Sequence, residues 1–182
     1  HLAARAANHQ ALTPLDFLAR SQEAFAERPA VAWRERVWNY RQFAQIVARM
    51  AHFLKAQGVG DGDVVSIIST NRPEMLAAHY AVPLLGAVLN SINTRLDSAT
   101  ISYILEHSES RLFLIDPACQ TAAETAAQAS GVAVHLIGEG DLELLADRAP
   151  LPLPDHRDLI TDEWRPICLN YTSGTTGKPK GV

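Results

Sequence analysis

The clearest pattern of hydrophobic and polar positions lies between residues 39 and 58. Asn39 precedes it as an N-cap, and Gln42 three residues later completes the spacing of a capping box. Gly58 follows the last periodic position, where glycine commonly ends a helix. The apolar residues recur every three or four positions and so share one helical face: Phe43, Ile46, Val47, Met50, Ala51 and Leu54. This segment is therefore predicted to be an amphipathic helix.

Short, nearly continuous apolar runs follow, and helical segments separate them. The runs cover residues 64–69, 87–91, 112–116 and 132–137. The helices between them are predicted to begin near Pro73, Asp97 and Ala118, and Pro83 should shorten the last turn of the first of these. Because strands with continuous apolar character are usually covered on both faces, the alternation predicts a parallel sheet wound with helices. The expected fold class is α/β.

The flanking segments are less regular. Thr13 and Pro14 predict the start of a first helix, with Leu15, Leu18 and Phe25 on its apolar side. Residues 30–33 and 37–38 predict two short strands around a polar turn. Residues 139–165 are rich in proline and acidic residues, which predicts a surface connection with at most one helical turn. We therefore expect a disordered or arm-like stretch at 1–11 and an incomplete domain at 12–182.

Composition narrows the class of protein. With 182 residues, 47% hydrophobic and 20% charged, the chain has the composition of an ordinary globular protein. A net charge of −4 argues against a nucleic-acid surface. No apolar run approaches the roughly 20 residues of a membrane helix, and the first residues have no signal-peptide pattern. Cys119 and Cys168 lack metal-ligand spacing, which favours reduced, packed thiols of a cytoplasmic protein.

The most specific chemistry is carried by the last twelve residues, 171–182. A short apolar run at 167–169, expected to be a buried strand, leads into them. Two of the three lysines of the chain, Lys178 and Lys180, stand here among glycine and hydroxyl-bearing residues. Glycines allow backbone N–H groups to face an anion, hydroxyls add further donors, and lysine adds positive charge. The stretch is therefore predicted to be a phosphate-binding loop at the carboxyl end of the last strand, where ligands of wound sheets bind.

This loop does not fit the Walker pattern G-x-x-x-x-G-K-[ST], because Pro179 and Val182 stand where the second glycine would follow Gly174 or Gly177. It matches [YF]-T-S-G-T-T-G-x-P-K-G throughout, and in this it resembles the adenylate-forming superfamily. Residues 28–31, 71–74 and 86–90 also look like the N-terminal half of acyl-CoA synthetases, in the same order. Residues 79–97 are similar to short- and medium-chain fatty-acid ligases.

The resemblance implies an acid–thiol ligase that forms an acyl-adenylate from a carboxylic acid and Mg-ATP, and then a thioester with coenzyme A. In that family the loop holds the β- and γ-phosphates. Carried over to this chain, the cofactor-binding residues are Thr172, Ser173, Gly174, Thr175, Thr176, Gly177 and Lys180. Hydroxyls, close backbone donors and the Lys180 ammonium would share the phosphate charge, whereas Lys178 occupies the variable position and is expected to be solvated.

The resemblance places no catalytic residue and no metal ligand within this chain. The residues for adenine, ribose, magnesium, the acyl group and the late lysine would all follow Val182. The chain is thus expected to be the N-terminal fragment of a longer ligase and to be inactive alone. Two alternatives share the loop: an amino-acid adenylation domain of a peptide synthetase, and a non-catalytic module that binds nucleotide or a partner protein.

Other residues that could carry chemistry have simpler interpretations. His79 is expected to be a satisfied core histidine, His52 a solvated one, and His107 a favourable cation at a helix C-terminus. Asn71 and Asn93 are expected to cap helices or form turns. The tryptophans are expected to pack in the interior: Trp33, Trp38 and Trp164.

Overall fold

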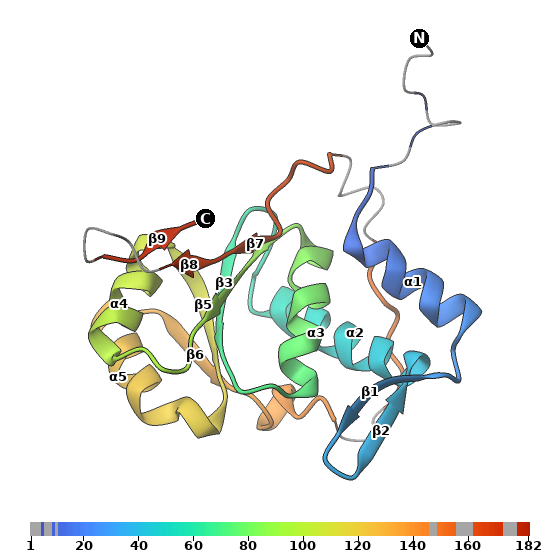
Figure 1. The fold of residues 1–182 in the computed structure, drawn as a ribbon, viewed down its shortest axis with the longest axis horizontal. Coiled ribbons are helices and arrows are strands. Elements are labelled where there is room, and N and C mark those ends of the chain that lie inside the picture. The colour runs from blue at the N-terminus through green and yellow to red at the C-terminus, as the bar shows by residue number, and fades with distance from the viewer. Residues whose placement is uncertain (1–4, 6–8, 10, 146–148, 156–161, 173–177) are drawn as a thin grey trace.

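A computed structural model describes residues 5, 9, 11–145, 149–155, 162–172 and 178–182. Its centre is a sheet of five parallel strands in the order β6-β5-β3-β4-β7 (Figure 1). The strands are β3 (Val64–Ile68), β4 (Val88–Ile92), β5 (Ser110–Ile115), β6 (Ala133–Leu136) and β7 (Cys168–Leu169). The predicted α/β class and parallel sheet are confirmed.

Helices cover both faces of this sheet, and the two faces form separate cores (Figure 1). One core lies under α2 (Tyr40–Ala56) and α3 (Pro73–Ala81), and the other lies under α4 (Ser98–His107) and α5 (Gln120–Ser130). Successive residues of a strand point to opposite faces, so Val65 and Ile67 of β3 enter the first core and Ile68 enters the second. This explains why the strands are apolar at nearly every position.

Local sequence rules account for several helix boundaries. The Thr13 side chain accepts from the Leu15 N–H at the start of α1 (Pro14–Ala24), and both bonds of the Asn39–Gln42 capping box form before α2. Asp97 caps α4. After α3 the chain continues as a 3₁₀ turn, η1 (Pro83–Leu85), and Gly86 ends it with a φ of 71°. Similar 3₁₀ turns are η2 (Pro117–Cys119), before α5, and η3 (Gly140–Leu142).

Three predictions of burial are wrong. Phe25 is 54% exposed because α1 ends at Ala24, and Trp164 is 88% exposed. His79 is exposed because α3 turns its small residues Ala77, Ala78 and Ala81 toward the core. Trp38 is buried as predicted and belongs to β2 (Arg36–Asn39), which pairs with β1 (Pro29–Trp33) as an antiparallel hairpin. His52 is half-buried, and its Nε2 lies 3.0 Å from the Pro152 carbonyl oxygen.

The segment after β6 is more than a surface connection, which corrects the expectation for residues 139–165. Leu142 and Leu144 are buried in the core beside α2. Gln45 of α2 exchanges two hydrogen bonds with the backbone of Leu151, and Arg49 donates to the Leu144 carbonyl. The part of this segment that the structure describes is therefore tied along α2 before the chain returns to the sheet.

The last sheet strand, β7, also differs from its prediction. It lies at the sheet edge, pairs with β4, and leaves Cys168 exposed rather than buried. Both cysteines are free, and Cys119 is half-buried. The predicted arm at 1–11 falls mostly on residues outside the described ranges and stays a prediction.

Candidate functional site

The predicted phosphate loop joins the two strands of a small hairpin. These strands are β8 (Tyr171–Thr172) and β9 (Lys180–Gly181), with Tyr171 opposite Gly181 and Thr172 opposite Lys180. Beyond them, the backbones of Asn170 and Val182 exchange hydrogen bonds of 2.9 and 2.8 Å. Of the residues assigned to phosphate, Ser173, Gly174, Thr175, Thr176 and Gly177 lie outside the described residues. The structure thus describes the base of the loop.

The pairing brings two of the assigned residues together. Thr172 and Lys180 are cross-strand partners, and the side chains of such partners lie on the same face of a hairpin. Both residues are exposed. Within the described ranges no carboxylate forms an ion pair with Lys180, which leaves its positive charge available to a bound anion. A hydroxyl beside an uncompensated ammonium group is a donor set suited to phosphate.

The opposite side of the hairpin contacts α4. The Tyr171 hydroxyl lies 2.7 Å from Nδ1 of His107, and the two rings meet edge to face with centroids 5.7 Å apart. Lys178 is exposed as expected, and its Nζ lies 5.3 Å from the centroid of the Tyr103 ring. Burial raises the pKa of the Tyr171 phenol, and Tyr103 adds to this effect. The Tyr171 O–H therefore stays protonated at neutral pH and can donate to His107.

A second polar cluster joins β3 and β5 at their carboxyl ends. One carboxylate oxygen of Asp116 accepts from the Thr70 hydroxyl at 2.6 Å and the Thr70 N–H at 3.1 Å. The other accepts from the Ala118 N–H and from Arg72, both at 3.1 Å. Burial alone would raise the pKa of Asp116, but these hydrogen bonds and the Arg72 charge outweigh it and lower the pKa to about 2. Asp116 is therefore a buried carboxylate that stays ionised.

Arg72 completes this cluster. Its guanidinium also donates two bonds to Glu74, at 2.9 and 2.7 Å, and the Glu74 side chain is 1% exposed. Burial lowers the pKa of Arg72, yet the bonds and charges of Glu74 and Asp116 raise it overall. Sequence reasoning noted residues 71–74 for their resemblance to acyl-CoA synthetases and missed this ion-pair cluster. Its single positive charge is shared by two carboxylates, so the cluster joins the ends of β3 and β5 to α3 and has no free cation for a phosphate.

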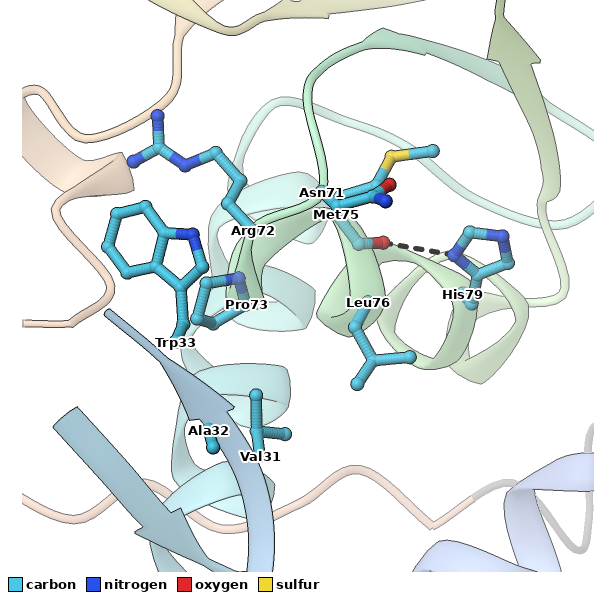
Figure 2. A pocket seen from close by; sticks show the side chains of 9 residues that line it. All are labelled: Val31, Ala32, Trp33, Asn71, Arg72, Pro73, Met75, Leu76 and His79. Atoms are coloured by element: carbon cyan, nitrogen blue, oxygen red, sulfur yellow. Dashed lines mark hydrogen bonds between the residues drawn. The ribbon is translucent and has the colours of Figure 1, made fainter. Parts of the chain in front are cut away.

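Arg72 also borders an apolar groove of about 380 Å³ between β1 and the start of α3 (Figure 2). Figure 2 shows Trp33, Met75 and Leu76 lining it, and the Nδ1 of His79 bonded to the Met75 carbonyl at 2.9 Å. The groove is lined by residues of β1 and α3, whereas the β8–β9 hairpin contacts α4. Because the Arg72 guanidinium is already bonded to two carboxylates, it does not offer the groove the free positive charge that phosphate requires.

The described residues contain no group of three histidine, cysteine, aspartate or glutamate side chains that could hold a metal ion. A search of the same residues finds no helix with the length and apolar character to cross a bilayer.

Asn93 forms the predicted turn, its side chain accepting from the Arg95 N–H, whereas the Asn71 side chain does not cap α3.

Wound parallel sheets of this kind bind ligands at the carboxyl ends of their strands, where the β8–β9 hairpin follows β7. Comparison with known families specifies the class of protein. The family described as AMP-binding enzyme matches residues 18–182. The chain belongs to this family. It is 37% identical to the probable acyl-activating enzyme 12, peroxisomal, of Arabidopsis thaliana, covering 100% of this chain and 35% of that protein. It is 35% identical to the trans-cinnamate:CoA ligase, peroxisomal, of Petunia hybrida, and the match covers 97% of this chain and 35% of that protein.

Solved structures agree on the fold. The anthranilate CoA ligase AuaEII, solved with anthranoyl-AMP, superposes with a TM-score of 0.84 at 23% identity over 97% of this chain and 34% of that chain. The O-succinylbenzoate coenzyme A synthetase of Bacillus subtilis, solved with AMP, superposes with a TM-score of 0.73 at 28% identity over 91% of this chain and 41% of that chain. The chain spans about a third of the length of the curated relatives it matches. Both relatives are named as peroxisomal, so the predicted cytoplasmic location is not confirmed.

Proposed function

We propose that this chain is the phosphate-binding N-terminal part of an ATP-dependent acyl-CoA ligase. In the first step a carboxylate oxygen attacks the α-phosphorus of Mg-ATP, giving an acyl-adenylate and pyrophosphate. In the second step the thiol of coenzyme A attacks the acyl carbonyl carbon and releases AMP. The observation that supports this most directly is the β8–β9 hairpin, in which Thr172 and Lys180 of the family loop are paired.

The residues of this chain contribute positioning and charge. Lys180 and Thr172 would contact the β- and γ-phosphates, with hydroxyls and backbone N–H groups of residues 173–177 completing the cradle. Phosphoryl-transfer chemistry depends mainly on such preorganised donors, because charge must be stabilised on the leaving pyrophosphate. Mg²⁺ enters as part of the Mg-ATP substrate in this proposal, and no step assigns it a ligand from this chain.

The relatives suggest the class of acid. Their names include ligases for trans-cinnamate, benzoate, acetate or butyrate, and 2-methylpropanoate. These are small monocarboxylic acids, aliphatic or aromatic. We therefore propose a short- to medium-chain or small aromatic acid as the substrate, and a panel of these acids is the natural set for the assay.

The test is ATP–pyrophosphate exchange by the complete ligase, measured with Lys180→Ala. Removing one preorganised donor or charge from a developing oxyanion costs about 100-fold in rate, and we expect a fall of this order. Lys178→Ala, two residues away, should lower the rate by less than Lys180→Ala does, because Lys178 contacts the Tyr103 ring and is not assigned to phosphate. Lys55→Ala, at an exposed position in the last turn of α2, is the control for loss of a surface lysine. An unchanged rate in Lys180→Ala would remove Lys180 from the phosphate site.

The same assay separates the alternatives. A peptide-synthetase adenylation domain would exchange pyrophosphate with amino acids and would form no coenzyme A thioester. A non-catalytic module would bind ATP without exchange for any acid in the panel. Exchange with a small acid, followed by thioester formation when coenzyme A is added, supports the ligase.

A further inference from the structure

The base of the hairpin is held from one side by α4. His107 and Tyr103 stand four positions apart on this helix, and such residues share a helical face. Their rings lie 5.4 Å apart, and each ring contacts a different end of the loop. His107 contacts Tyr171, where the loop begins, and Tyr103 contacts Lys178, close to where it ends. The loop is thus anchored to α4 at both ends.

The Tyr171 anchor fixes the direction of the phosphate-facing residues. Successive side chains of a strand point to opposite faces, so a Tyr171 that faces α4 forces Thr172 to face away from it. Lys180, the cross-strand partner of Thr172, then shares that outward face. A rotation of β8 that broke the contact between Tyr171 and His107 would turn both donors away together.

Close packing on the inner face supports this orientation. A Cβ added to Gly181, the partner of Tyr171, would lie 3.0 Å from Cδ1 of Leu169 and 3.4 Å from Cζ of Tyr171. Leu169 and the Tyr171 ring thus occupy the space where a side chain at position 181 would lie. The absence of a side chain at position 181 therefore lets the Tyr171 ring lie close to β9, on the side of the hairpin that faces α4.

We propose that His107 is a positioning residue for acyl-adenylate formation and acts through Tyr171 to hold Thr172 and Lys180 toward the nucleotide phosphates. This inference rests on the proposed ligase function. The contact joins residues 64 positions apart and lies outside the loop motif. The motif accepts tyrosine or phenylalanine at position 171, so the motif itself does not require the bond between the hydroxyl and the imidazole.

The experiment measures the two half-reactions of the complete ligase separately. His107→Ala should raise the KM for ATP in pyrophosphate exchange about tenfold, equivalent to about 1.4 kcal/mol, and should lower kcat as well, because Lys180 and Thr172 also stabilise charge on the leaving pyrophosphate. Thioester formation from a presynthesised acyl-adenylate and coenzyme A should stay within about twofold of wild type, because the β- and γ-phosphates have left before that step. A general loss of structure would impair both half-reactions.

Two further variants identify the contact. His107→Asn places an amide near the position of Nδ1 and should recover the KM for ATP to within about threefold of wild type, because a hydrogen bond to Tyr171 is restored. Tyr171→Phe should raise the KM about fivefold, and the double variant Tyr171→Phe with His107→Ala should be no worse than His107→Ala alone, since both changes remove one interaction.

The outcomes separate this inference from the proposed function. An active wild type with an unchanged KM for ATP in His107→Ala overturns the role of His107 and leaves the ligase intact. Equal losses in both half-reactions, without recovery in His107→Asn, assign His107 a purely structural role and also overturn the inference. A wild type that exchanges pyrophosphate with no acid overturns the ligase, and the role of His107 falls with it.

Discussion

The ionised Asp116 carboxylate is expected to be a main source of stability at the carboxyl edge of the sheet. Asp116→Asn removes its charge at nearly constant shape. The amide can still accept from one side, but its NH₂ group must face either the Thr70 donors or the Arg72 guanidinium. The variant therefore loses a charge-assisted contact and brings two donors against each other, and we expect it to unfold more easily.

The magnitude follows from the pKa of Asp116. The pKa is lowered from 3.8 to about 2, and each unit corresponds to about 1.4 kcal/mol, so ionisation contributes about 2–3 kcal/mol at neutral pH. Because the folded pKa lies below the unfolded one, this stability is fully present above about pH 4 and is lost as pH falls toward 2. By linkage, about 1 kcal/mol of it should already be lost at pH 3.

The assay is urea denaturation followed by tryptophan fluorescence, for which Trp33 beside Arg72 is a local probe. We expect Asp116→Asn to lower the free energy of unfolding by about 2–3 kcal/mol at pH 7. At pH 3 the difference in this free energy between wild type and variant should be about 1 kcal/mol smaller. Asp141→Asn, at an exposed position, should change it by less than about 0.5 kcal/mol. If the free-energy difference between wild type and Asp116→Asn is as large at pH 3 as at pH 7, the low pKa of Asp116 is refuted.

Two further substitutions test other parts of the fold. Gly131 ends α5 with a φ of 71° and has open space around its Cα, so Gly131→Ala should lower the free energy of unfolding by about 1 kcal/mol from backbone strain alone. Gly60 also lies in open space but has no positive φ, so Gly60→Ala should lower it by less than about 0.5 kcal/mol in the same denaturation assay. Leu144→Ala should lower the free energy of unfolding by about 2–5 kcal/mol if the segment after β6 is part of the core. A loss below about 1 kcal/mol would show that this segment contributes little to the core.

The elements that sequence predicted well are those specified by neighbouring residues. α2 was predictable because its cap, its apolar period and its terminal glycine all lie within one short segment. The β3, β4 and β5 strands were predictable because burial on both faces leaves an apolar run. The loop predicted to bind phosphate was recognisable because its glycine, hydroxyl and lysine residues are consecutive, although the hairpin at its base was not foreseen.

What sequence missed depends on which strands become neighbours. Asp116 and Thr70 are 46 positions apart, and they meet because β5 pairs with β3 rather than with β4. His79 was misplaced because large apolar residues at 75 and 76 suggested a buried face, whereas α3 packs closely through its alanines. Cys168 was misplaced because its apolar run lies at an edge, where one side of the strand has no neighbour among the described strands.

The same dependence on neighbours applies to the phosphate loop itself. β7 pairs with β4 through two residue pairs, Cys168 with Leu89 and Leu169 with Asn90. So short a ladder restrains the rotation of the following hairpin weakly, because few backbone bonds resist it. The contacts of Tyr171 and Lys178 with α4 supply the missing restraint. On the proposed role of His107, the orientation of Thr172 and Lys180 thus depends on a helix that the motif does not include.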